Sequence, residues 1–377
     1  MPQWWKIRRE LKRLGNHLLE WPTDTTNFLF GTFYYDRFLA HKKTILSGLQ
    51  DTTDKRAVYL IFPKNGLQPG HFRTLDYLAS KGFAVTVVSN LPLNPGQKVA
   101  VLPKCHMYIE RPNYGYDFGG YRDGILSMRN DVAAIKQLIL LNDSVWFPVS
   151  SKTDWLADVD DLGVEFAGAV SNYGIPRVDP DHFRELSFDY RTDHKNFHYC
   201  SFALSLGQKI VQDPKFIEFW ASFPLTNKKK RTVRRGEIGL TAWILRRGYS
   251  HAETLGVHRL AECLGKLSDP ELRDVARHVI VLDDSRLKKA KANVILSIDK
   301  LSRTDLVNFV LMVAARQGTA YALAYYSVLF LGFPFLKKSP LWLDQDAAKI
   351  SSLLLGALSE PAADEALMEA NDLQLSK

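Results

Sequence analysis

Glycines, carboxylates and amides gather in one stretch of the sequence, between Arg111 and Pro148. The stretch opens with a glycine-punctuated polar loop, continues through a helix-like segment, and closes an apolar run with a polar triplet. Carboxylate oxygens are hard ligands for a divalent cation, and glycines let backbone N–H groups approach a phosphate closely. The polar residues that could do this chemistry are Asn113, Asp117, Asn142, Asp143 and Ser144. The pattern predicts a site for a phosphorylated ligand, which we interpret as a sugar nucleotide.

Three glycines in the loop have two alternative roles. Gly115, Gly119 and Gly120 would let the backbone approach a bound donor, and the following helix would direct its N-terminus at phosphate. Glycines also serve the geometry of a loop alone. Asp117 could likewise bind the ligand or cap the helix. The sequence leaves both alternatives open.

Strand and helix alternate from residue 55 onward, and this alternation must position the polar residues. Four apolar runs predict strands at residues 57–62, 83–89, 105–110 and 137–141. Near-continuous apolar strands separated by helices are typical of a mostly parallel α/β sheet with helices on both faces. Each run is followed by an asparagine, namely Asn65, Asn90, Asn113 and Asn142. Because ligands bind at the carboxyl ends of such strands, the four loops would converge on one crevice, although asparagine also ends strands in any fold.

A later helix supplies a carboxylate that could act as a general base. The segment 236–249 has Glu237 in its first turn and Gly248 at its end, as the macrodipole and C-cap rules favour. Helix-start electrostatics alone would explain Glu237. His198 begins the strand-like run 198–204 and is a second candidate base, although a lone strand histidine is more often structural.

Composition favours a folded protein with anionic partners. With 377 residues, 46% of them hydrophobic, the chain can bury a sizeable core. A formal charge of +8 favours a membrane surface, a phosphorylated substrate or nucleic acid. The sequence shows no basic surface interleaved with aromatics, so we expect no nucleic acid partner. The three cysteines are far apart, which argues against a zinc site or disulfides and fits a reducing compartment.

Basic and apolar segments outside the sheet raise the question of a membrane. Residues 4–21 predict an amphipathic basic helix, which would suit either an anionic bilayer or packing on the main domain. Six cations at 228–235 form either a solvated loop or a contact with diphosphate or lipid. The uncharged run 317–336 is near the lower length for a span, and its alternative is a buried helix. No secretory signal peptide is visible.

Three regions are expected along the chain. Residues 1–54 form an N-terminal helical segment, 55–262 the α/β domain, and 263–377 a helical region that could be membrane-associated. The long polar segment 172–196 is a candidate flap over an acceptor. The acidic tail from residue 359 is expected to be frayed.

Six segments occur in an order that is similar to that of a known family. They are residues 88–90, 113–121, 140–145, 198–202, 237–240 and 332–337. The most specific are the Asn-x-Gly-x-Asp-x-Gly loop at 113–119 and the Asn-Asp-Ser strand end at 142–144. Together they resemble the rhamnan synthesis protein F family, glycosyltransferases of bacterial surface polysaccharide assembly. The resemblance implies a GT-A-like (Rossmann-like) fold and a nucleotide-sugar donor.

The resemblance also implies roles for single residues. Glu237 matches the general base of inverting relatives, and His198 is the reserve base. Asp143 is the candidate ligand for Mg²⁺ or Mn²⁺, although the usual Asp-x-Asp is replaced here by a triplet with one carboxylate, and Asp143 could instead be a turn former. The donor-binding candidates are Asn90, Asn113, Gly115, Asp117, Gly119, Gly120, Arg122, Asn142, Asp143 and Ser144.

These expectations describe a rhamnosyltransferase that uses dTDP-L-rhamnose to extend a lipid-linked O-antigen or capsular glycan. It would be cytoplasmic and peripheral on the cytoplasmic face of the inner membrane, beside other polysaccharide assembly enzymes. The alternative is a degenerate transferase that binds at the membrane without catalysing transfer. The missing second carboxylate and the long helical C-terminal region motivate that alternative.

Overall fold

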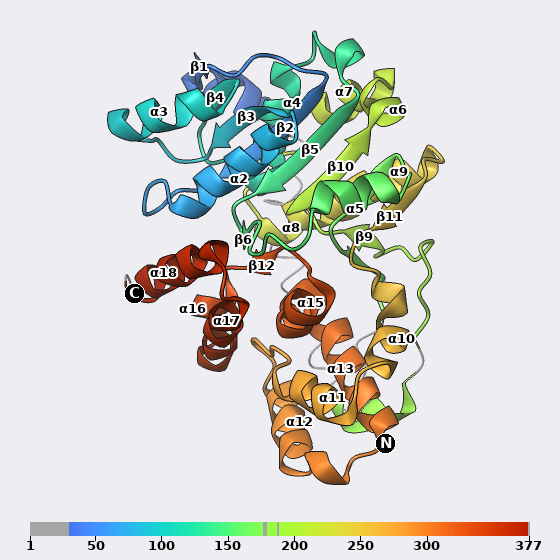
Figure 1. The fold of residues 1–377 in the computed structure, drawn as a ribbon. Helices are drawn as coiled ribbons and strands as arrows, with labels where there is room; N and C mark the ends of the chain where they lie inside the picture. The colour runs from blue at the N-terminus through green and yellow to red at the C-terminus, as the bar shows by residue number, and fades with distance from the viewer. Residues whose placement is uncertain (1–29, 176–178, 187, 376–377) are drawn as a thin grey trace.

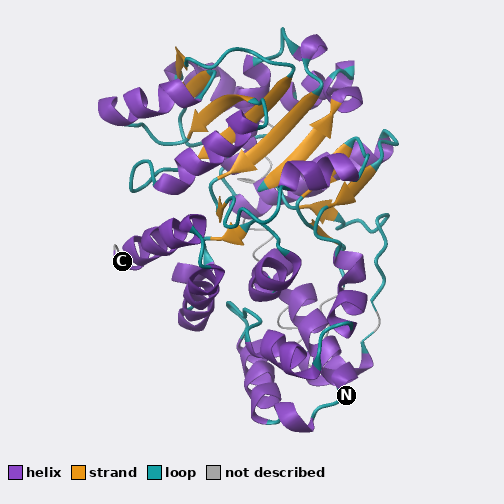
Figure 2. Cartoon of the chain, in the orientation of Figure 1, coloured by secondary structure: helices purple, strands orange, loops and turns teal. Residues whose placement is uncertain are grey.

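The computed structural model describes residues 30–175, 179–186 and 188–375. Its centre is an eight-stranded mixed sheet surrounded by helices (Figures 1 and 2). Across the sheet the strands are β1 (Thr44–Ser47), β4 (Met107–Glu110), β3 (Ala84–Ser89), β2 (Lys55–Ile61), β5 (Gln137–Asn142), β10 (Ala203–Gly207), β7 (Phe166–Gly168) and β11 (His251–Glu253). The predicted helix N-terminal to residue 30 lies outside the described residues.

Most neighbouring strands of the sheet run parallel. Strands β4, β3, β2 and β5 are parallel, whereas β1 and β10 are antiparallel to their neighbours. Strand β7 reverses again beside β10, and β11 runs parallel to β7. The predicted α/β class with a mostly parallel sheet is confirmed. Strand β1 belongs to the segment 1–54, so part of that segment joins the edge of the sheet.

Two helices cover opposite faces of the central strands. Every residue of β3 is buried, as is every residue of β2 after Lys55, because neighbouring side chains point to opposite faces and both faces are covered. Helix α4 (Tyr116–Ser127) covers one face, and helix α2 (Pro69–Ser80) covers the other. A Cβ at Gly120 would lie 2.3 Å from Leu60 Cδ1, so glycine at this position lets α4 approach the sheet.

The chain changes direction across the sheet between β2 and β5. Strands β3 and β4 follow β2 on one side, and β5 then returns to its other side. The carboxyl ends of β2 and β5 therefore lie next to each other at a topological switch point, where open α/β sheets bind ligands. This edge of the sheet faces the helical region, which is below the sheet in Figure 1.

The remaining elements lie around the sheet and below it. Beside the sheet are α3 (Pro95–Val101), α5 (Trp155–Asp161), α6 (Gln208–Val211), α7 (Pro214–Ala221), α8 (Lys229–Val233), η6 (Arg234–Ile238) and α9 (Gly239–Arg246). The C-terminal region consists of α10 (Leu260–Gly265), α11 (Asp269–Arg277), α12 (Ser285–Leu296), α13 (Arg303–Gln317), α14 (Thr319–Ala322), α15 (Ala324–Leu331), α16 (Pro340–Leu343), α17 (Gln345–Leu358) and α18 (Pro361–Leu375). Two small antiparallel sheets complete the fold. One pairs strand β6 (Val145–Trp146) with β12 (Leu336–Lys337), and the other pairs β8 (Ser171–Asn172) with β9 (His198–Tyr199).

The apolar run 317–336 packs inside the helical region. It is divided into α14 and α15, which are bounded by Gly318 and Gly332 with positive φ angles of 86° and 67°. Leu323, Tyr326 and Val328 within it are buried. Every helix in the described part of the chain is too short or too polar to span a bilayer.

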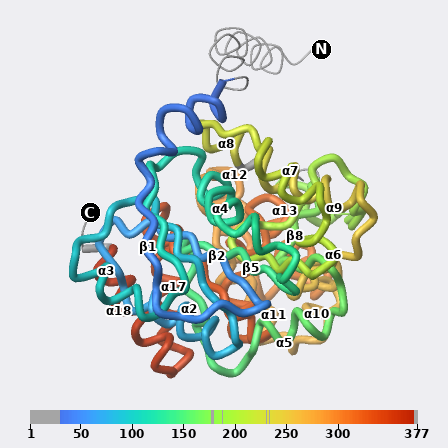
Figure 3. The backbone as a smooth tube through the Cα atoms, turned by 90° about the horizontal axis from the view of Figure 1, so that it is seen from above, coloured from blue at the N-terminus to red at the C-terminus, as the bar shows by residue number. Residues whose placement is uncertain are grey.

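The prediction of a frayed acidic tail is wrong for residues 361–375. They form α18, which packs on α2 (Figures 1 and 3). Glu365 of α18 forms an ion pair with Arg73, and Glu369 forms one with Lys338 at 2.7 Å. Polar composition misled the prediction because the helix is attached by buried charges and small residues such as Ala370 rather than by large apolar side chains.

Candidate functional site

Asp143 joins the two strands at the switch point. Its Oδ2 accepts hydrogen bonds from the Phe62 backbone N–H, at 2.6 Å, and from His71 Nε2, at 3.3 Å. His71 Nδ1 accepts from the Gln68 backbone N–H, at 2.8 Å, so Nε2 carries the proton. Burial acts to raise the pKa of Asp143, but His71, Lys338 and the Phe62 amide outweigh it and lower the pKa below its usual range. Asp143 is therefore a carboxylate that is already engaged within the fold.

Asn142 brings the other predicted polar residues together. Its Nδ2 donates to Asp117 Oδ2 at 3.3 Å, and its Oδ1 accepts from the Ser144 backbone N–H and hydroxyl at 3.1 and 2.6 Å. Asp117 lies in the first turn of α4, whose N-cap is Gly115. Asp117 is therefore not the helix cap, and it faces the end of β5.

Asp117 lies in an environment that disfavours its charge. Burial raises the pKa of Asp117 to about 6, with Asp143 and Glu237 adding to the shift and Lys337 opposing it. Mutual influence of this kind requires the three acids to share one neighbourhood. Lys229, in the basic run 228–235, also acts on the Asp117 pKa, so the run lies close enough to influence this site.

Glu237 is held rigidly by the segment that precedes β10. Its Oε1 accepts from both the backbone N–H and the hydroxyl of Ser201, each at 2.9 Å. Its Oε2 lies 3.7 Å from His198 Nε2, and His198 Nδ1 is 2.7 Å from the backbone oxygen of Asn196. The Glu237 side chain is 14% exposed. The structure therefore places the two candidate bases side by side, with Glu237 Oε2 free of the Ser201 bonds.

The segment 200–202 connects the Glu237 side of the site to the Asn142 side. The Phe202 backbone oxygen accepts from the Asn142 N–H at 3.1 Å, and the Ser201 backbone oxygen accepts from the Tyr121 hydroxyl at 2.7 Å. Burial raises the pKa of the Cys200 thiol to about 12, with Glu237 adding to the shift and Lys337 opposing it. Cys200 is therefore a neutral thiol and not a nucleophile.

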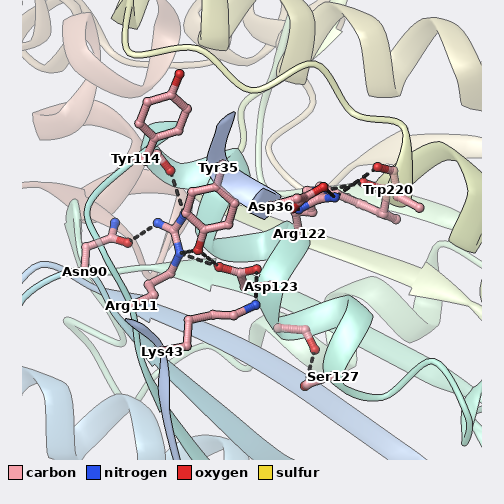
Figure 4. A network of polar contacts seen from close by, with 12 residues as sticks. Tyr35, Asp36, Lys43, Asn90, Arg111, Tyr114, Arg122, Asp123, Ser127 and Trp220 are labelled. Atoms are coloured by element: carbon pink, nitrogen blue, oxygen red, sulfur yellow. Dashed lines mark hydrogen bonds and ion pairs between the residues drawn. The ribbon is translucent and has the colours of Figure 1, made fainter. Parts of the chain in front are cut away.

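Two predicted donor-binding residues are engaged elsewhere (Figure 4). Asn90 Oδ1 accepts from Arg111 Nη1 at 2.6 Å, inside a buried polar network. Arg122 forms two hydrogen bonds with Asp36, at 2.7 and 2.8 Å, and also donates to the Trp220 backbone oxygen. Both residues are explained by the fold, and we leave them out of the proposed site. Asn90 follows a strand as the binding residues do, and Arg122 lies on α4 behind the loop, so position in the sequence could not show that both are structural.

The loop glycines are also explained by the fold. Gly115 has a φ angle of +82°, which favours glycine. A Cβ at Gly119 would lie 2.2 Å from the Tyr114 backbone oxygen, and Gly120 contacts the sheet. These contacts favour the loop-geometry alternative. Asn113 is exposed at the start of the same loop.

Lys337 and Ser201 belong to the site but were not predicted as site residues. Lys337 Nζ lies 3.2 Å from Ser144 Oγ, and Ser201 holds Glu237. Both residues lie in segments that carry the family resemblance, at 332–337 and 198–202. The sequence feature that could have indicated Lys337 is a charged residue directly after an apolar run. Only the pairing of β12 with β6 shows that Lys337 lies near the end of β5.

The residues at this strand end do not fit a divalent metal. In residues 30–175, 179–186 and 188–375, no three or more His, Cys, Asp or Glu side chains form a group that could hold a metal ion. Asp143 Oδ2 already accepts two hydrogen bonds, and Asn142 Oδ1 is occupied by Ser144. Mg²⁺ at a phosphate site usually takes one or two carboxylates besides waters and substrate phosphates. The triplet offers one carboxylate with one oxygen already engaged, so we do not carry the metal role of Asp143 into the proposed site.

The predicted flap lies against the helical region. Its 3₁₀ segment η5 (Pro180–Glu185) packs on α13, where the Phe183 and Phe309 rings are 5.8 Å apart. Part of the segment 172–196 thus links the sheet domain to the helices. Its predicted role over an acceptor is untested.

The comparisons with known proteins agree with this architecture. The family model described as rhamnan synthesis protein F matches residues 85–322, which is more than half of the chain. The chain therefore belongs to the rhamnan synthesis protein F family. A curated relative, the uncharacterized protein y4gN of Sinorhizobium fredii (strain NBRC 101917 / NGR234), is 33% identical over 239 residues. That match covers 63% of this chain and 57% of the relative, so the chain spans little more than half of its length.

Similar solved structures are mannosyltransferases of low sequence identity. The mannosyltransferase PcManGT from Pyrobaculum calidifontis, in complex with GDP-Man and Mn²⁺, is 13% identical with a TM-score of 0.33, over 93% of this chain and 88% of that chain. Core-mannan synthase A from Aspergillus fumigatus, in its Mn/GDP form, is 11% identical with a TM-score of 0.27, over 50% and 66% of the two chains. Likeness at these TM-scores is too low to transfer residue roles.

Proposed function

We propose that the chain is a glycosyltransferase that moves a sugar from a nucleoside diphosphate to an acceptor hydroxyl. The observation that carries this proposal is the placement of Glu237 on Ser201, in the segment 200–202 that also bonds to Asn142, the partner of Asp117. Acid, amide and base groups from separate elements meet at the edge of an α/β sheet where ligands bind. Membership of a family of rhamnan synthesis proteins supports the same reaction class.

Glu237 would act as the general base of a single displacement. Its Oε2 takes the proton of the acceptor hydroxyl while that oxygen bonds to the anomeric carbon. The bond from this carbon to the diphosphate breaks, and the nucleoside diphosphate leaves with the electron pair. Ser201 holds Oε1 with two hydrogen bonds, so Oε2 keeps one orientation. Because one displacement inverts the anomeric centre, we propose an inverting enzyme.

Asn142, Asp117 and Ser144 would bind the donor. Asn142 is 3% exposed and fixes both neighbours through its amide, so Asp117 and Ser144 are held together at the end of β5. Ser144 is exposed and can donate its backbone N–H or hydroxyl when a phosphate displaces its internal bonds. Positioning of this kind places the anomeric carbon within reach of the acceptor.

The proposed donor is dTDP-L-rhamnose and the proposed acceptor a growing lipid-linked O-antigen or capsular glycan, as the name of the rhamnan synthesis family suggests. The test is nucleoside diphosphate release from a donor panel that contains dTDP-L-rhamnose, UDP-glucose and GDP-mannose, with and without EDTA. We expect dTDP-L-rhamnose to give the highest rate and EDTA to leave that rate unchanged. Release from a different donor would exclude the assignment of rhamnose as the transferred sugar. If no donor binds, the proposal that the chain is a glycosyltransferase is excluded.

One observation favours a second function, a binding module without catalysis. The Asn142–Ser144 triplet carries a single carboxylate, and the donor set does not fit a metal. A degenerate transferase would bind the donor and release no nucleoside diphosphate with any acceptor glycan. The same panel, combined with calorimetric donor binding, separates the two functions.

An exposed aromatic patch supports a position at the cytoplasmic face of the inner membrane. Phe30, Phe33, Tyr34 and Phe38 are 47–60% exposed around the π-helix η1 (Tyr35–Leu39), and exposed Arg37 lies among them. Aromatic side chains with neighbouring cations suit the interface of an anionic bilayer. Other polysaccharide assembly enzymes would meet the chain there.

Replacing two aromatics of this patch should weaken binding to vesicles. We expect Phe33→Ser combined with Phe38→Ser to lower the partition coefficient on phosphatidylglycerol vesicles on the order of tenfold, because the apolar area entering the bilayer is lost. Co-sedimentation with the vesicles measures the partition coefficient. Val99→Ser is the control, because Val99 is 72% exposed on α3, outside the patch. Equal sedimentation of the double variant and the wild type would contradict a membrane role for the patch.

A further inference from the structure

Lys337 is a buried lysine that forms no ion pair with any residue in the described part of the chain. The residue is 9% exposed at the end of β12, which pairs with β6 so that Lys337 is opposite Val145. Its Nζ lies 3.2 Å from Ser144 Oγ, and 4.1 Å from the centre of the Phe202 ring. Among the residues that the structure describes, none of the carboxylates lies within ion-pair distance of this ammonium group.

The neighbouring lysine shows how this fold neutralises a buried ammonium group. Lys338 points to the other side of β12 and pairs with Glu369 at 2.7 Å, where the Glu369 side chain is 4% exposed. Burying an ammonium group without an ion pair is costly, because its hydration is lost. Asp117 is the carboxylate on which Lys337 acts, and it lies beyond ion-pair distance. An ammonium group has three N–H donors, and the structure assigns one of them to Ser144. Lys337 therefore has donors available for an anion.

The position of Lys337 identifies the kind of anion. Ser144 Oγ, the group it contacts, is exposed at the end of β5, beside Asn142 and Asp117. The rings of Phe202 and Tyr321, with centres 4.1 and 5.5 Å from its Nζ, stabilise the cation. A fixed cation at the switch point of an α/β sheet is suited to phosphate groups.

We propose that Lys337 binds the donor diphosphate and neutralises the leaving nucleoside diphosphate, the task that a divalent metal would otherwise perform. This inference rests on the proposed glycosyl transfer. As the bond between the anomeric carbon and the diphosphate oxygen breaks, that oxygen takes the electron pair and Lys337 donates hydrogen bonds to it. Lys337 transfers no proton in this step, and the proton of the acceptor goes to Glu237. Lys337 would perform this task without a metal ion, in agreement with the engagement of Asp143 Oδ2 and Asn142 Oδ1 within the fold.

The test is calorimetric binding of dTDP, pyrophosphate and thymidine to the full chain in EDTA. Lys337→Met should lower the affinity for dTDP and for pyrophosphate about 10- to 100-fold, because charge-assisted hydrogen bonds to phosphate are lost. Thymidine, which has no phosphate, should bind equally to both proteins. Lys337→Arg should retain most of the dTDP affinity. The control is Lys349→Met on α17, whose side chain is 80% exposed.

Thermal unfolding separates a binding role from a folding role. Without ligand, Lys337→Met should unfold close to the wild-type temperature, because it removes both the cost of burying a charge and the attraction of that charge to Asp117. Saturating dTDP should raise the wild-type unfolding temperature and leave that of the variant nearly unchanged.

Three results would overturn the inference. The first is an equal affinity of Lys337→Met and wild type for dTDP. The second is an equal loss of affinity for thymidine and for dTDP in the variant. The third is a wild type that binds dTDP only when Mn²⁺ is present. Each leaves the proposed glycosyl transfer standing if donor turnover is observed. If the wild type binds none of dTDP, UDP and GDP, the proposed function and this inference fall together.

Discussion

Glu237→Gln should lower the rate of nucleoside diphosphate release about 10²- to 10⁴-fold, the usual contribution of a general base. Glutamine has the same shape, and its amide oxygen can still accept the two hydrogen bonds from Ser201. The amide cannot take the acceptor proton, so the loss falls on kcat rather than on donor affinity. The fold is preserved because the partners of the side chain are preserved.

Release kinetics at saturating donor and acceptor, with circular dichroism of each protein, measure this effect. Glu218→Gln is the matched control, since Glu218 is 64% exposed on α7 and pairs with Lys215. His198 is 3.7 Å from Glu237 and is the reserve base, so His198→Asn is compared in the same assay. Unchanged release in Glu237→Gln with a large loss in His198→Asn would transfer the base role to His198. Unchanged release in both would remove this pair from the mechanism.

Arg111→Met should lower the free energy of unfolding by about 3–5 kcal/mol, the cost of breaking a buried ion pair on one side. Arg111 Nε donates to Asp123 Oδ2 at 2.7 Å, and its other donors reach Asn90 and the Tyr114 backbone oxygen (Figure 4). The Tyr35 hydroxyl also donates to Asp123. Removing the guanidinium leaves the Asp123 carboxylate buried, and the loop that leads to Asp117 loses its anchor.

Urea unfolding followed by tryptophan fluorescence measures this loss. Arg191→Met is the control, because its pair with Asp193 is 63% and 66% exposed and surface pairs contribute less than about 1 kcal/mol. Burial acts to raise the pKa of Asp123, but Arg111 and Lys43 outweigh it and lower that pKa. The stabilisation is therefore present above the usual aspartate pKa and is lost as pH falls through the lowered one. A loss in Arg111→Met no larger than in the control would contradict a structural role for the network.

Local patterns were sufficient to predict the parallel half of the sheet. Strands β2, β3, β4 and β5 are continuous apolar runs separated by helices, and such runs signal burial on both faces without any knowledge of partners. The meeting of Asp117 with Asn142 was predictable in part, because carboxyl ends of parallel strands share one edge. The strands before these two residues, β4 and β5, are not neighbours as expected, since β3 and β2 lie between them. The reversal of β10 within the sheet depends on pairing across the chain, which no local pattern encodes.

Residue type at a strand end did not separate binding groups from structural ones. Asn90 follows β3 as Asn142 follows β5, yet Arg111 engages Asn90 in the core. The same difficulty applies to Lys337 and to α18, whose roles depend on contacts with residues distant in the sequence. Sequence patterns thus located the edge of the sheet that carries the site, and tertiary contacts decided which residues belong to it.

The most direct measurement is a crystal structure of the full chain with bound dTDP. We predict that its phosphates lie within hydrogen-bonding distance of Lys337 Nζ and Ser144 Oγ, with Glu237 Oε2 facing the space beyond the terminal phosphate. A nucleotide bound away from the carboxyl end of β5, or with Glu237 turned from its diphosphate, would contradict a sugar-nucleotide site at this edge of the sheet.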